Sequence, residues 1–459
     1  MYQIQFDTPI HVHFIGIGGI SMSGLAQILL KEHFTVSGSD AKESPLTRQL
    51  EENGARIFYG QKASNIMDGI DAVVYTAAIH EDNQEYQAAL QKGLPMLSRA
   101  ELLGQIMANY RTPIAVSGTH GKTTTTSMLS HIFLAGDLDP TISVGGILQA
   151  IGGNIRVGDS DLFVTEACEY TNSFLHFLPK ISIILNVDAD HLDFFKDLDD
   201  IRASFRKFAQ LLPADGALVI NGAIPDLDFF IDGLPCRVCT YGMDSSFDYA
   251  AVNIAYDRDG HASFDFVKEG IFADRVSLSV NGEHNVQNAL AALAVADILN
   301  IPLETSKKGL KAFKGTNRRF EHKGEFRGVT VIDDYAHHPA EIKATLAAAR
   351  HYPHQEVWCI FQPHTYTRTK ALFSDFVDAL AGADHVILAD IYAARETDTL
   401  GVSSKALALA LKEKGTDAYY FPTFEEIEDF CRSHCENGDL LITMGAGNVV
   451  NIGESLLKL

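Results

Sequence analysis

The sequence predicts an α/β protein of three domains, in which short apolar strands alternate with helices. The chain has 459 residues, a length that suggests about three domains of ordinary size. Apolar runs at 11–15 and 114–117 each lead into a glycine-rich turn and then a helix start, as in nucleotide-binding sheets. A third series of strands and helices begins near residue 329.

The charge balance restricts the possible partners. The formal net charge is −22, because 59 Asp and Glu residues outnumber 37 Lys and Arg residues. This argues against a nucleic-acid-binding surface, which usually carries a basic stripe. The sequence has no basic start followed by a long apolar stretch, and no apolar segment of 18 residues. We therefore expect a cytoplasmic protein without membrane insertion, whose oligomeric state the sequence leaves open.

The six cysteines are too few for a disulfide framework in a chain of this length. Cys236 and Cys239 lie in a strand-like run, and Cys431 and Cys435 lie at helical spacing around His434. Neither pair has a matching second half, so buried structural thiols are favoured over zinc ligands.

The most informative stretch is 114–126, an apolar strand followed by a glycine turn. Gly118 and Gly121 allow the backbone to present N–H groups to anionic oxygens, and Lys122 adds a positive charge. The Thr123 hydroxyl can bind Mg²⁺. A generic phosphate loop has its first glycine at the position of Val116, so this is a shorter variant. It predicts a nucleoside triphosphate site, although an ordinary strand-to-helix turn is the alternative.

Residues 11–40 are typical of the opening of a Rossmann-like domain: strand, turn, helix and strand. The turn contains Gly16, Gly18 and Gly19, but Ser21 replaces the third glycine of the dinucleotide motif. Asp40 ends the second strand, where an acidic residue would contact a ribose or base. Both NAD and a nucleotide diphosphate fit this pattern. A strand at 72–75 and helices at 81–92 and 99–108 continue the domain, which ends near 110–113.

Two further strands of the second domain end in polar side chains. The strand at 161–166 ends in Glu166, and the strand at 181–186 leads to Asp190, His191 and Asp193. Carboxylates near a triphosphate suit Mg²⁺, with His a less typical ligand, whereas capping of the next helix is the alternative for the two Asp residues. The short strands of 213–281 predict a scaffold. His284, Asn285 and Asn288, at the start of an alanine-rich helix, could contact an adenine edge.

The third domain is predicted to be a second doubly wound sheet. Its strand ends carry three polar segments, where such folds bind ligands: 362–369, 390–396 and 445–448. Pro339 suits the first turn of a helix. The expected strands are 329–332, 356–361, 385–389, 418–421 and 439–444, and the expected helices are 340–350, 368–381, 403–414 and 423–432.

Taken in order, these motifs resemble the ATP-dependent Mur ligases of peptidoglycan synthesis, over essentially the whole chain. The opening His13–Gly24 is similar to the branch of that family that joins L-alanine to UDP-N-acetylmuramate, which favours a UDP moiety over NAD. The other segments that carry the resemblance are Gly118–Thr125, Glu166 with Asp190–Asp193, Gly282–Asn288, Asn317–Glu321, Asp334–Pro339 and Phe361–Thr369.

The resemblance implies a UDP-substrate domain at 1–110, an ATP-binding P-loop domain at 111–322 and a Rossmann-like, amino-acid-binding domain at 323–459. The lactyl carboxylate of the substrate would attack the γ-phosphate of ATP, and the amine of L-alanine would displace phosphate from the resulting acyl phosphate. Metal ions and Lys122 would offset the repulsion between the two anions.

The resemblance also implies roles for single residues. The catalytic residues would be Lys122, His120 (facing the carboxylate), His191 and Glu166. Mg²⁺ would bind Thr123, Glu166 and His191. ATP would contact Gly118, Thr119, Gly121, Lys122, Thr123 and Thr124 through its phosphates, His284, Asn285 and Asn288 through adenine, Arg319 through phosphate and Asp334 through ribose. The UDP substrate would contact Gly16, Gly18, Gly19, Asp40 and Thr76. L-Alanine would contact Tyr335, His337 and His364, with Arg368 pairing its carboxylate.

The chain departs from the family pattern in two places. Some relatives carry a carbamylated lysine where this chain has Phe205, with Lys207 two residues on, and we expect no carbamylation. Some alanine-adding enzymes have Arg where this chain has Thr365, which leaves Arg368 as the strong carboxylate anchor. The alternatives are a ligase that attaches a whole tripeptide, an NAD-dependent oxidoreductase and a nucleotide-gated binding protein without turnover.

Overall fold

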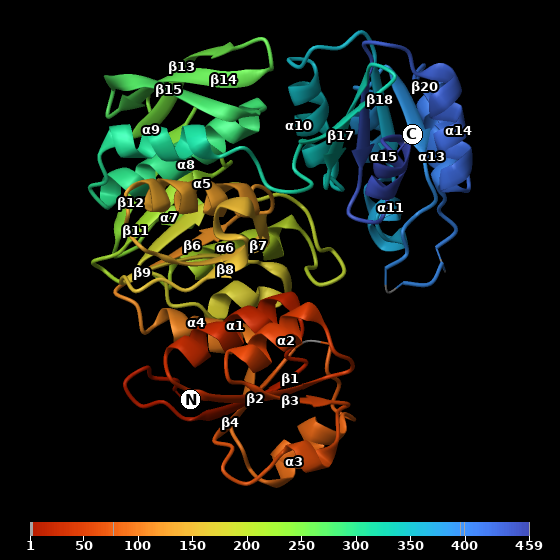
Figure 1. Ribbon diagram of the computed structural model, residues 1–459. Coiled ribbons are helices and arrows are strands. Elements are labelled where there is room, and N and C mark those ends of the chain that lie inside the picture. Colours follow the sequence, from red (N-terminus) through yellow and green to blue (C-terminus); the bar gives the residue numbers. More distant parts are fainter. Residues whose placement is uncertain (1–2, 77, 395, 399, 459) are drawn as a thin grey trace. The chain divides into compact units, whose positions relative to one another are not determined.

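A computed structural model describes residues 3–76, 78–394, 396–398 and 400–458. The chain folds into two compact units. Unit 1 contains Met1–Val187, Asp199–Thr240 and Val295–Ile301, and unit 2 contains Asp188–Leu198, Tyr241–Ala294 and Pro302–Leu459. Strands alternate with helices in both units (Figure 1), which confirms the predicted α/β class.

Unit 1 begins with a sheet of five parallel strands in the order β3-β2-β1-β4-β5, the order of a Rossmann-like half. Helices α1, α2 and α4 are drawn above these strands in Figure 1, and α3 is drawn below them. The elements are β1 His11–Ile15, α1 Ile20–Lys31, β2 Thr35–Asp40, α2 Pro45–Glu52, β3 Arg56–Tyr59, the 3-10 turn Ala63–Asn65, β4 Ala72–Tyr75, α3 Gln84–Gln91, β5 Met96–Ser98 and α4 Arg99–Met107.

The second sheet of unit 1 follows the order β12-β11-β10-β6-β9-β7-β8, and β6 lies near its centre. β6 pairs in parallel with β10 and β9, so the carboxyl ends of these three strands meet at one edge. The elements are β6 Thr112–Ser117, α5 Lys122–Ala135, β7 Thr141–Leu148, β8 Gly153–Arg156, β9 Leu162–Glu166, β10 Ile181–Ile184, α6 Leu198–Ala209, β11 Ala217–Asn221, α7 Leu227–Ile231 and β12 Arg237–Gly242, with 3-10 turns at Gln149–Ile151 and Tyr170–His176.

Unit 2 contains an antiparallel set of three strands and a separate mixed sheet. β14 pairs with β13 on one side and with β15 on the other, which agrees with the scaffold expected for this stretch. The first elements of the unit are β13 Tyr249–Tyr256, β14 His261–Lys268, β15 Ile271–Asn281, α8 Glu283–Ile298 and α9 Leu303–Ala312.

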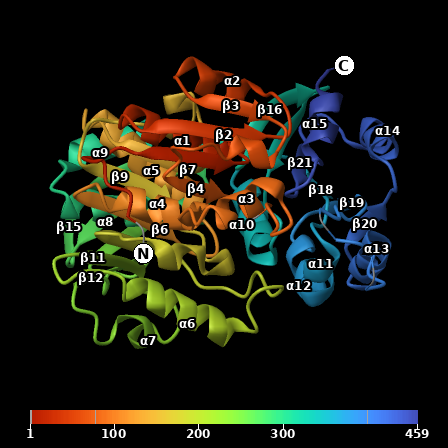
Figure 2. The ribbon, with the colours of Figure 1, turned by 90° about the horizontal axis from the view of Figure 1, so that it is seen from below.

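The mixed sheet of unit 2 has the order β16-β17-β21-β18-β19-β20, and it is parallel except for β16 at its edge. One apolar core lies between the strands and α10, α12 and α13, and another lies between the strands and α14 and α15. Figure 2 shows α12 and α15 on opposite sides of the strands. The elements are β16 Glu321–Phe326, β17 Val329–Asp334, α10 Pro339–Ala349, β18 Val357–Phe361, α11 Tyr366–Ala371, α12 Phe373–Leu380, β19 His385–Leu388, α13 Ser404–Glu413, β20 Asp417–Tyr420, α14 Phe424–His434, β21 Leu440–Met444 and α15 Val450–Leu456.

The structure corrects one expected helix. The stretch 368–381 forms two helices, α11 and α12, because the backbone at Leu372 leaves the helical region with φ −110° and ψ 25°. The Thr369 hydroxyl donates a hydrogen bond to the Thr365 carbonyl at 2.6 Å, a contact that tends to bend helices. Pro339 occupies the first turn of α10, as predicted.

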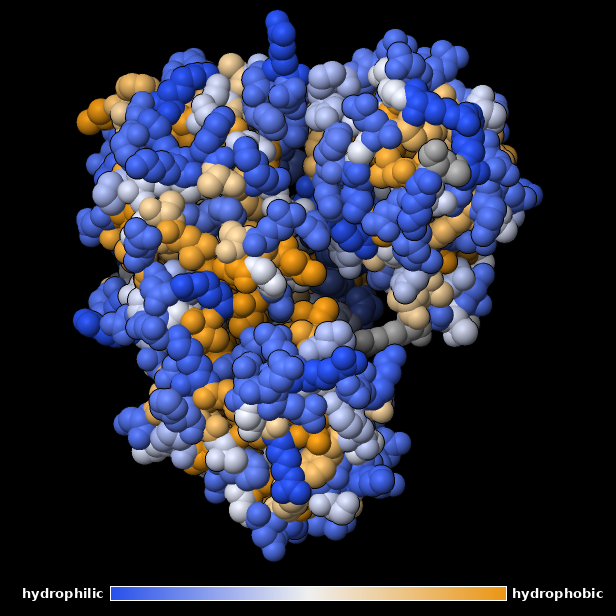
Figure 3. Space-filling view, in the orientation of Figure 1, coloured by the Kyte–Doolittle hydropathy of each residue, from blue (hydrophilic) through white to orange (hydrophobic). Residues whose placement is uncertain are grey.

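The visible surface of both units is mainly hydrophilic (Figure 3), in keeping with the many charged residues. Cys236, Cys239 and Cys431 are buried thiols, as expected, whereas Cys435 is only partly buried. Within the described ranges, no helix is both long enough and apolar enough to cross a membrane.

Candidate active site

The loop between β6 and α5 has the geometry of a phosphate cradle. Gly118 has φ +144° and Gly121 has φ +86°, backbone conformations that glycine adopts readily. A side chain at Gly118 would also bring its Cβ within 2.8 Å of Leu185 Cβ, so the loop can lie against β10 only because it has none. Thr119 and Thr124 are nearly buried beside the loop, and Thr124 lies in the first turn of α5.

Lys122 is held inside this loop. Its Nζ donates hydrogen bonds to the carbonyls of Gly118 and Thr119 and to Glu169 Oε2, the last at 2.9 Å. The Lys122 side chain is 15% exposed and the Glu169 side chain is 2% exposed. Burial opposes the ammonium form, but the Glu169 carboxylate and nearby groups outweigh it, so the pKa of Lys122 is raised. The loop therefore holds a permanent positive charge.

Glu166 lies beside the phosphate loop, as the strand pattern predicts. It pairs with Val116 across β9 and β6, and its Oε1 accepts a hydrogen bond from the Gly145 N–H at 2.5 Å. A Cβ at Gly145 would lie 2.9 Å from the Glu166 carboxylate, and one at Gly146 would lie 3.3 Å from the Thr123 methyl. The carboxylate and the threonine thus approach neighbouring residues of β7. A hydroxyl and a carboxylate are suitable ligands for Mg²⁺.

His191 belongs to unit 2, whereas Glu166 belongs to unit 1, so their shared metal site stays a prediction. His191 has φ +54°, and its N–H donates to Asp190 Oδ1 at 2.7 Å. Helix α6 begins only at Leu198, so Asp190 and Asp193 do not cap it.

Four of the residues predicted to hold ATP lie in unit 2. His284, Asn285 and Asn288 lie at the start of α8, and Arg319 lies two residues before β16. His284 packs against Gly282, where a Cβ would lie 2.4 Å from the ring. Burial lowers the pKa of His284 to about 4, and the positive charge of Arg319 adds to this effect. His284 is therefore neutral at pH 7 and close to Arg319. Asn288 donates to Asn285 Oδ1 at 3.1 Å, and Asn285 donates to the Asn281 carbonyl at 2.7 Å.

Asp334 is nearly buried, and protein groups already bind its carboxylate. Oδ2 accepts from the Phe320 N–H at 3.0 Å and from the Thr345 hydroxyl at 3.1 Å, and Oδ1 accepts from the Ala336 N–H at 2.8 Å. Burial raises its pKa to about 6 despite the opposing charge of Arg319. These bonds hold the segment that carries Arg319 close to β17. Ribose binding by Asp334 stays a prediction.

The structure brings together the four residues predicted to hold the amino acid. The Tyr335 and His337 rings lie 5.4 Å apart, and the His337 and His364 rings lie 5.9 Å apart. Arg368 Nη1 lies 3.3 Å from His364 Nδ1 and donates to it. Burial lowers the pKa of His337 to about 4, and its Nδ1–H donates to the Tyr335 carbonyl at 3.0 Å. The result is a cluster of neutral imidazoles around one guanidinium.

Arg368 already binds one carboxylate. Its Nε and Nη2 donate to Asp190 Oδ1 at 3.2 and 3.0 Å. Asp190 is buried, which disfavours its charge, but Arg368 together with His191 holds its pKa well below the usual range. His338 Nε2 contacts the Ala189 carbonyl at 3.1 Å. His338 and Arg368 thus both bind the segment that contains Ala189 and Asp190.

The glycine loop after β1 contacts Asp40 and Thr76, the two other residues predicted to bind the UDP substrate. A Cβ at Gly16 would lie 3.1 Å from the Thr76 methyl, and the Gly18 N–H donates to Asp40 Oδ2 at 2.8 Å. Gly19 caps α1. Arg99, which the sequence did not single out, donates to Ser21 Oγ at 3.2 Å, and burial lowers its pKa.

Sequence reasoning missed three acidic residues at these sites: Glu169, Asp190 as a partner of Arg368, and Glu341. Glu341 Oε1 lies 3.7 Å from Arg319, and its Oε2 accepts from the His337 N–H at 3.0 Å. A signal existed for Glu169, which follows Glu166 by three residues, and for Glu341, which lies three residues after the helix cap His338. No local pattern connects Asp190 to Arg368, which is 178 residues away.

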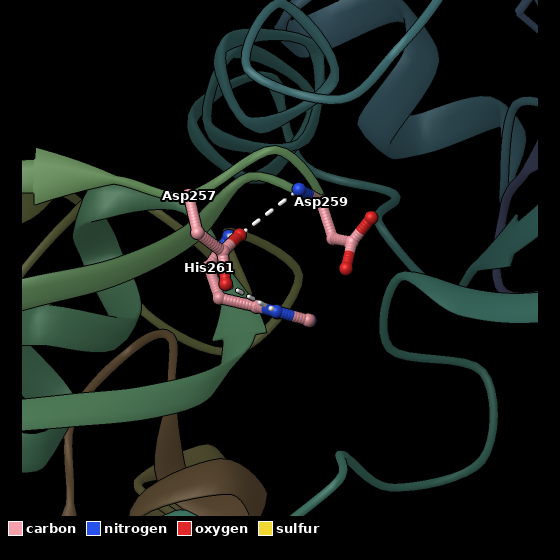
Figure 4. A group of neighbouring side chains, drawn as sticks. All are labelled: Asp257, Asp259 and His261. Atoms are coloured by element: carbon pink, nitrogen blue, oxygen red, sulfur yellow. Dashed lines mark hydrogen bonds and ion pairs between the residues drawn. The ribbon is translucent and has the colours of Figure 1, made fainter.

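One other cluster has metal-ligand side chains. Atoms of Asp257, Asp259 and His261 lie within 4.8 Å of one another in the turn between β13 and β14. Figure 4 shows the Asp259 carboxylate directed away from Asp257. Asp257 accepts hydrogen bonds from the N–H groups of Asp259 and His261 at 2.9 Å each, which is a turn-stabilising arrangement. The cluster therefore has a structural explanation as part of a turn.

The chain matches three family models. These are the "Mur ligase family, catalytic domain" over residues 11–111, the "Mur ligase middle domain" over 116–296 and the "Mur ligase, glutamate ligase domain" over 318–447. It is 61% identical over 458 residues, and over the full length of both chains, to the UDP-N-acetylmuramate–L-alanine ligase of Agathobacter rectalis.

Solved structures agree with these matches. The UDP-N-acetylmuramate-alanine ligase from Thermotoga maritima superposes with a TM-score of 0.78 at 29% identity, covering 98% of each chain. A murein peptide ligase from Psychrobacter arcticus gives a TM-score of 0.67 at 27% identity, again covering 98% of each chain. The chain belongs to the Mur ligase family.

Proposed function

We propose that this chain is an ATP-dependent ligase that joins L-alanine to UDP-N-acetylmuramate during the synthesis of peptidoglycan precursors. The observation that carries this conclusion is the 61% identity to the UDP-N-acetylmuramate–L-alanine ligase of Agathobacter rectalis, which covers the full length of both chains. The loop around Lys122 and the cluster around Arg368 supply what the reaction requires: one site for phosphates and another for an amino-acid carboxylate.

The reaction has two chemical steps. A lactyl carboxylate oxygen of UDP-N-acetylmuramate attacks the γ-phosphorus of ATP, and ADP leaves, which yields an acyl phosphate. The amine of L-alanine then attacks the acyl carbon, phosphate leaves with the bridging oxygen, and the nitrogen loses a proton. The first step brings two anions together, so fixed positive charge and N–H dipoles lower its barrier.

Lys122 supplies that charge at the β- and γ-phosphates. Its ammonium donates hydrogen bonds to two loop carbonyls and to Glu169, and the Glu169 carboxylate favours its charged form. ATP must therefore replace one of these bonds with a phosphate contact. His120 lies two residues before Lys122 in the same loop, and we assign it to face the reacting carboxylate.

The Thr123 hydroxyl and the Glu166 carboxylate suit Mg²⁺, since both are oxygen ligands. The two side chains approach adjacent glycines of β7, Thr123 through its methyl group and Glu166 through its carboxylate. His191 is the third residue that we propose as a Mg²⁺ ligand. When bound, Mg²⁺ neutralises phosphate charge as a Lewis acid. We assign Thr119, Thr124, the loop glycines and Arg319 to the phosphates of ATP. His284, Asn285 and Asn288 are assigned to adenine, and Asp334 to ribose.

Arg368 anchors the carboxylate of L-alanine while it remains bound to Asp190. A guanidinium has five N–H donors, and the two contacts to Asp190 and the one to His364 use three of them. Two donors remain for a substrate carboxylate. Tyr335, His337 and His364 enclose the amino acid.

The UDP substrate binds at the glycine loop of the first domain, through Gly16, Gly18, Gly19, Asp40 and Thr76. We propose domains at 1–110, 111–322 and 323–459, which overlap the family-model matches at 11–111, 116–296 and 318–447. The enzyme acts in the cytoplasm, where ATP and UDP-linked sugars are present.

Phosphate release from ATP, Mg²⁺ and UDP-N-acetylmuramate tests the proposal, with no amine, L-alanine, other amino acids or a tripeptide as acceptor. We expect sustained release with L-alanine and little without an amine. Release only with tripeptide would indicate the alternative, a peptide-recycling ligase. Equal release without any amine would contradict both.

A further inference from the structure

The phosphate loop is fastened to the end of β10. The Ser117 hydroxyl donates to the Ile183 carbonyl at 2.6 Å, and the Leu185 N–H donates to the Ser117 carbonyl at 3.0 Å. The Thr119 N–H then donates to the Asn186 carbonyl at 3.2 Å. The loop therefore continues the contact of β6 with β10 for two residues beyond the point where both strands end.

The Asn186 side chain makes the last contact of this series, and it binds both the backbone N–H and the backbone carbonyl of His120. Its Oδ1 accepts from the His120 N–H at 2.8 Å, and its Nδ2 donates to the His120 carbonyl at 3.1 Å. His120 lies between the two glycines whose backbone angles shape the cradle. An amide held at two points fixes the rotation of the backbone as well as its position.

We propose that Asn186 is a positioning residue that holds the phosphate loop in the conformation that binds ATP. Only its amide presents a donor and an acceptor side by side at this length, so Asp, Ser or Ala cannot replace both contacts. Without them, the backbone between Gly118 and Gly121 gains freedom that binding must then remove. The proposal rests on the proposed function only in taking ATP as the ligand.

The test compares the full-length Asn186→Ala variant with the unmodified protein. Binding of Mg·ADP is measured by calorimetry, without any acceptor substrate, and kcat and KM are then measured for all three substrates. Because the freed backbone must be ordered again when the nucleotide binds, we expect about a tenfold weaker ADP affinity. We expect a similar loss in kcat/KM for ATP, with the KM values of L-alanine and UDP-N-acetylmuramate within about twofold.

Asn109→Ala is a matched control. This partly buried asparagine also holds backbone groups through both ends of its amide, since Oδ1 accepts from the Phe6 N–H at 2.9 Å and Nδ2 donates to the Ile4 carbonyl at 3.0 Å. It lies in the first domain, where its Nδ2 also donates to the Gln105 carbonyl at 2.8 Å. The two variants should lose comparable thermal stability, but only Asn186→Ala should lose nucleotide affinity.

Two results would overturn the proposal. One is an ADP affinity within twofold of the unmodified protein in folded Asn186→Ala. The other is an equal rise of all three KM values in both variants, which would reduce Asn186 to a general stabilising role. If Asn186→Ala does not fold, Asn186→Ser is measured in the same way, with the same expectation. Inactivity of the unmodified protein with L-alanine would refute the proposed function, while its ADP binding would still decide the role of Asn186.

Discussion

Unit 1 contains two glycine loops that follow the same sequence pattern but handle charge in opposite ways. In the loop after β1, the Gly18 N–H donates to the carboxylate of Asp40. In the loop after β6, the cation Lys122 occupies the interior and pairs with Glu169. A strand, a glycine turn and a helix therefore do not define one kind of phosphate site. The side chains that fill the turn decide whether it favours a reacting triphosphate.

The cations near the two loops also differ in their partners. Lys122 has a buried carboxylate partner, whereas Arg99 donates a hydrogen bond to the neutral Ser21 hydroxyl at 3.2 Å. A partly buried guanidinium bound to a neutral group is suited to receive an anion from a ligand. We therefore predict that the first loop holds the diphosphate of the substrate, and that the second stabilises the charge that develops during phosphate transfer.

The largest expected effect is that of Lys122→Ala. Removing the cation at the transferred phosphate should lower kcat by roughly a thousandfold, the upper range for loss of one such electrostatic contact. Steady-state phosphate release checks this, and circular dichroism checks the fold. Lys207→Ala, on the exposed face of α6, is the control that should retain activity. Activity within a few fold of the unmodified protein would remove Lys122 from the assigned role.

Arg368→Ala should raise the KM for L-alanine by about tenfold to a hundredfold, because a charge-assisted contact to the substrate carboxylate is lost. The KM for ATP should change little. Arg350→Ala removes an exposed arginine that donates to the Gly382 carbonyl, and it should leave both values unchanged. A change confined to the ATP KM would show that Arg368 serves another ligand.

Arg99→Ala tests the other half of the comparison. We expect about a tenfold rise in the KM for UDP-N-acetylmuramate, consistent with one hydrogen bond between charged groups, and no change in ADP affinity. Arg111→Ala, which removes an exposed arginine 3.6 Å from Asp161, is the control. Should ADP affinity fall while the UDP-substrate KM stays constant, the contrast between the loops would be wrong.

The smallest expected effect concerns acid stability. Burial lowers the pKa values of His284 and His337 to about 4, from an ordinary value of 6.5. Between these values the unfolded chain binds protons that the folded chain does not, so stability falls as the pH drops from about 6.5 towards 4. His284→Gln and His337→Gln should each flatten this dependence in urea unfolding midpoints. Exposed His80→Gln should not, and an unchanged slope in the first two variants would contradict the burial argument.

Local sequence patterns predicted most elements and the strand ends that carry the site. Glu166 ends β9 beside the phosphate loop because parallel strands share an edge, and Thr76 reaches Gly16 for the same reason. These placements follow from alternation of strands and helices, which a single sequence displays. The break at Leu372 could not be predicted, since helix periodicity continues across it.

Partners that are distant in the sequence could not be predicted. Glu169 contacts Lys122 across 47 residues, and Asn186 contacts His120 across 66. Their residue types are common at strand ends, where they usually meet water or cap helices. Only the packing of the strands against the loop distinguishes these side chains from ordinary turn residues.

The transfer of an oxygen atom tests the central claim most directly. UDP-N-acetylmuramate labelled with ¹⁸O in its lactyl carboxylate is converted with ATP, Mg²⁺ and L-alanine, and the released phosphate is examined by mass spectrometry. Since the attacking carboxylate oxygen leaves with the phosphate, the account predicts one ¹⁸O atom in each phosphate and the other in the amide product. Unlabelled phosphate accompanying amide formation would contradict the acyl-phosphate route.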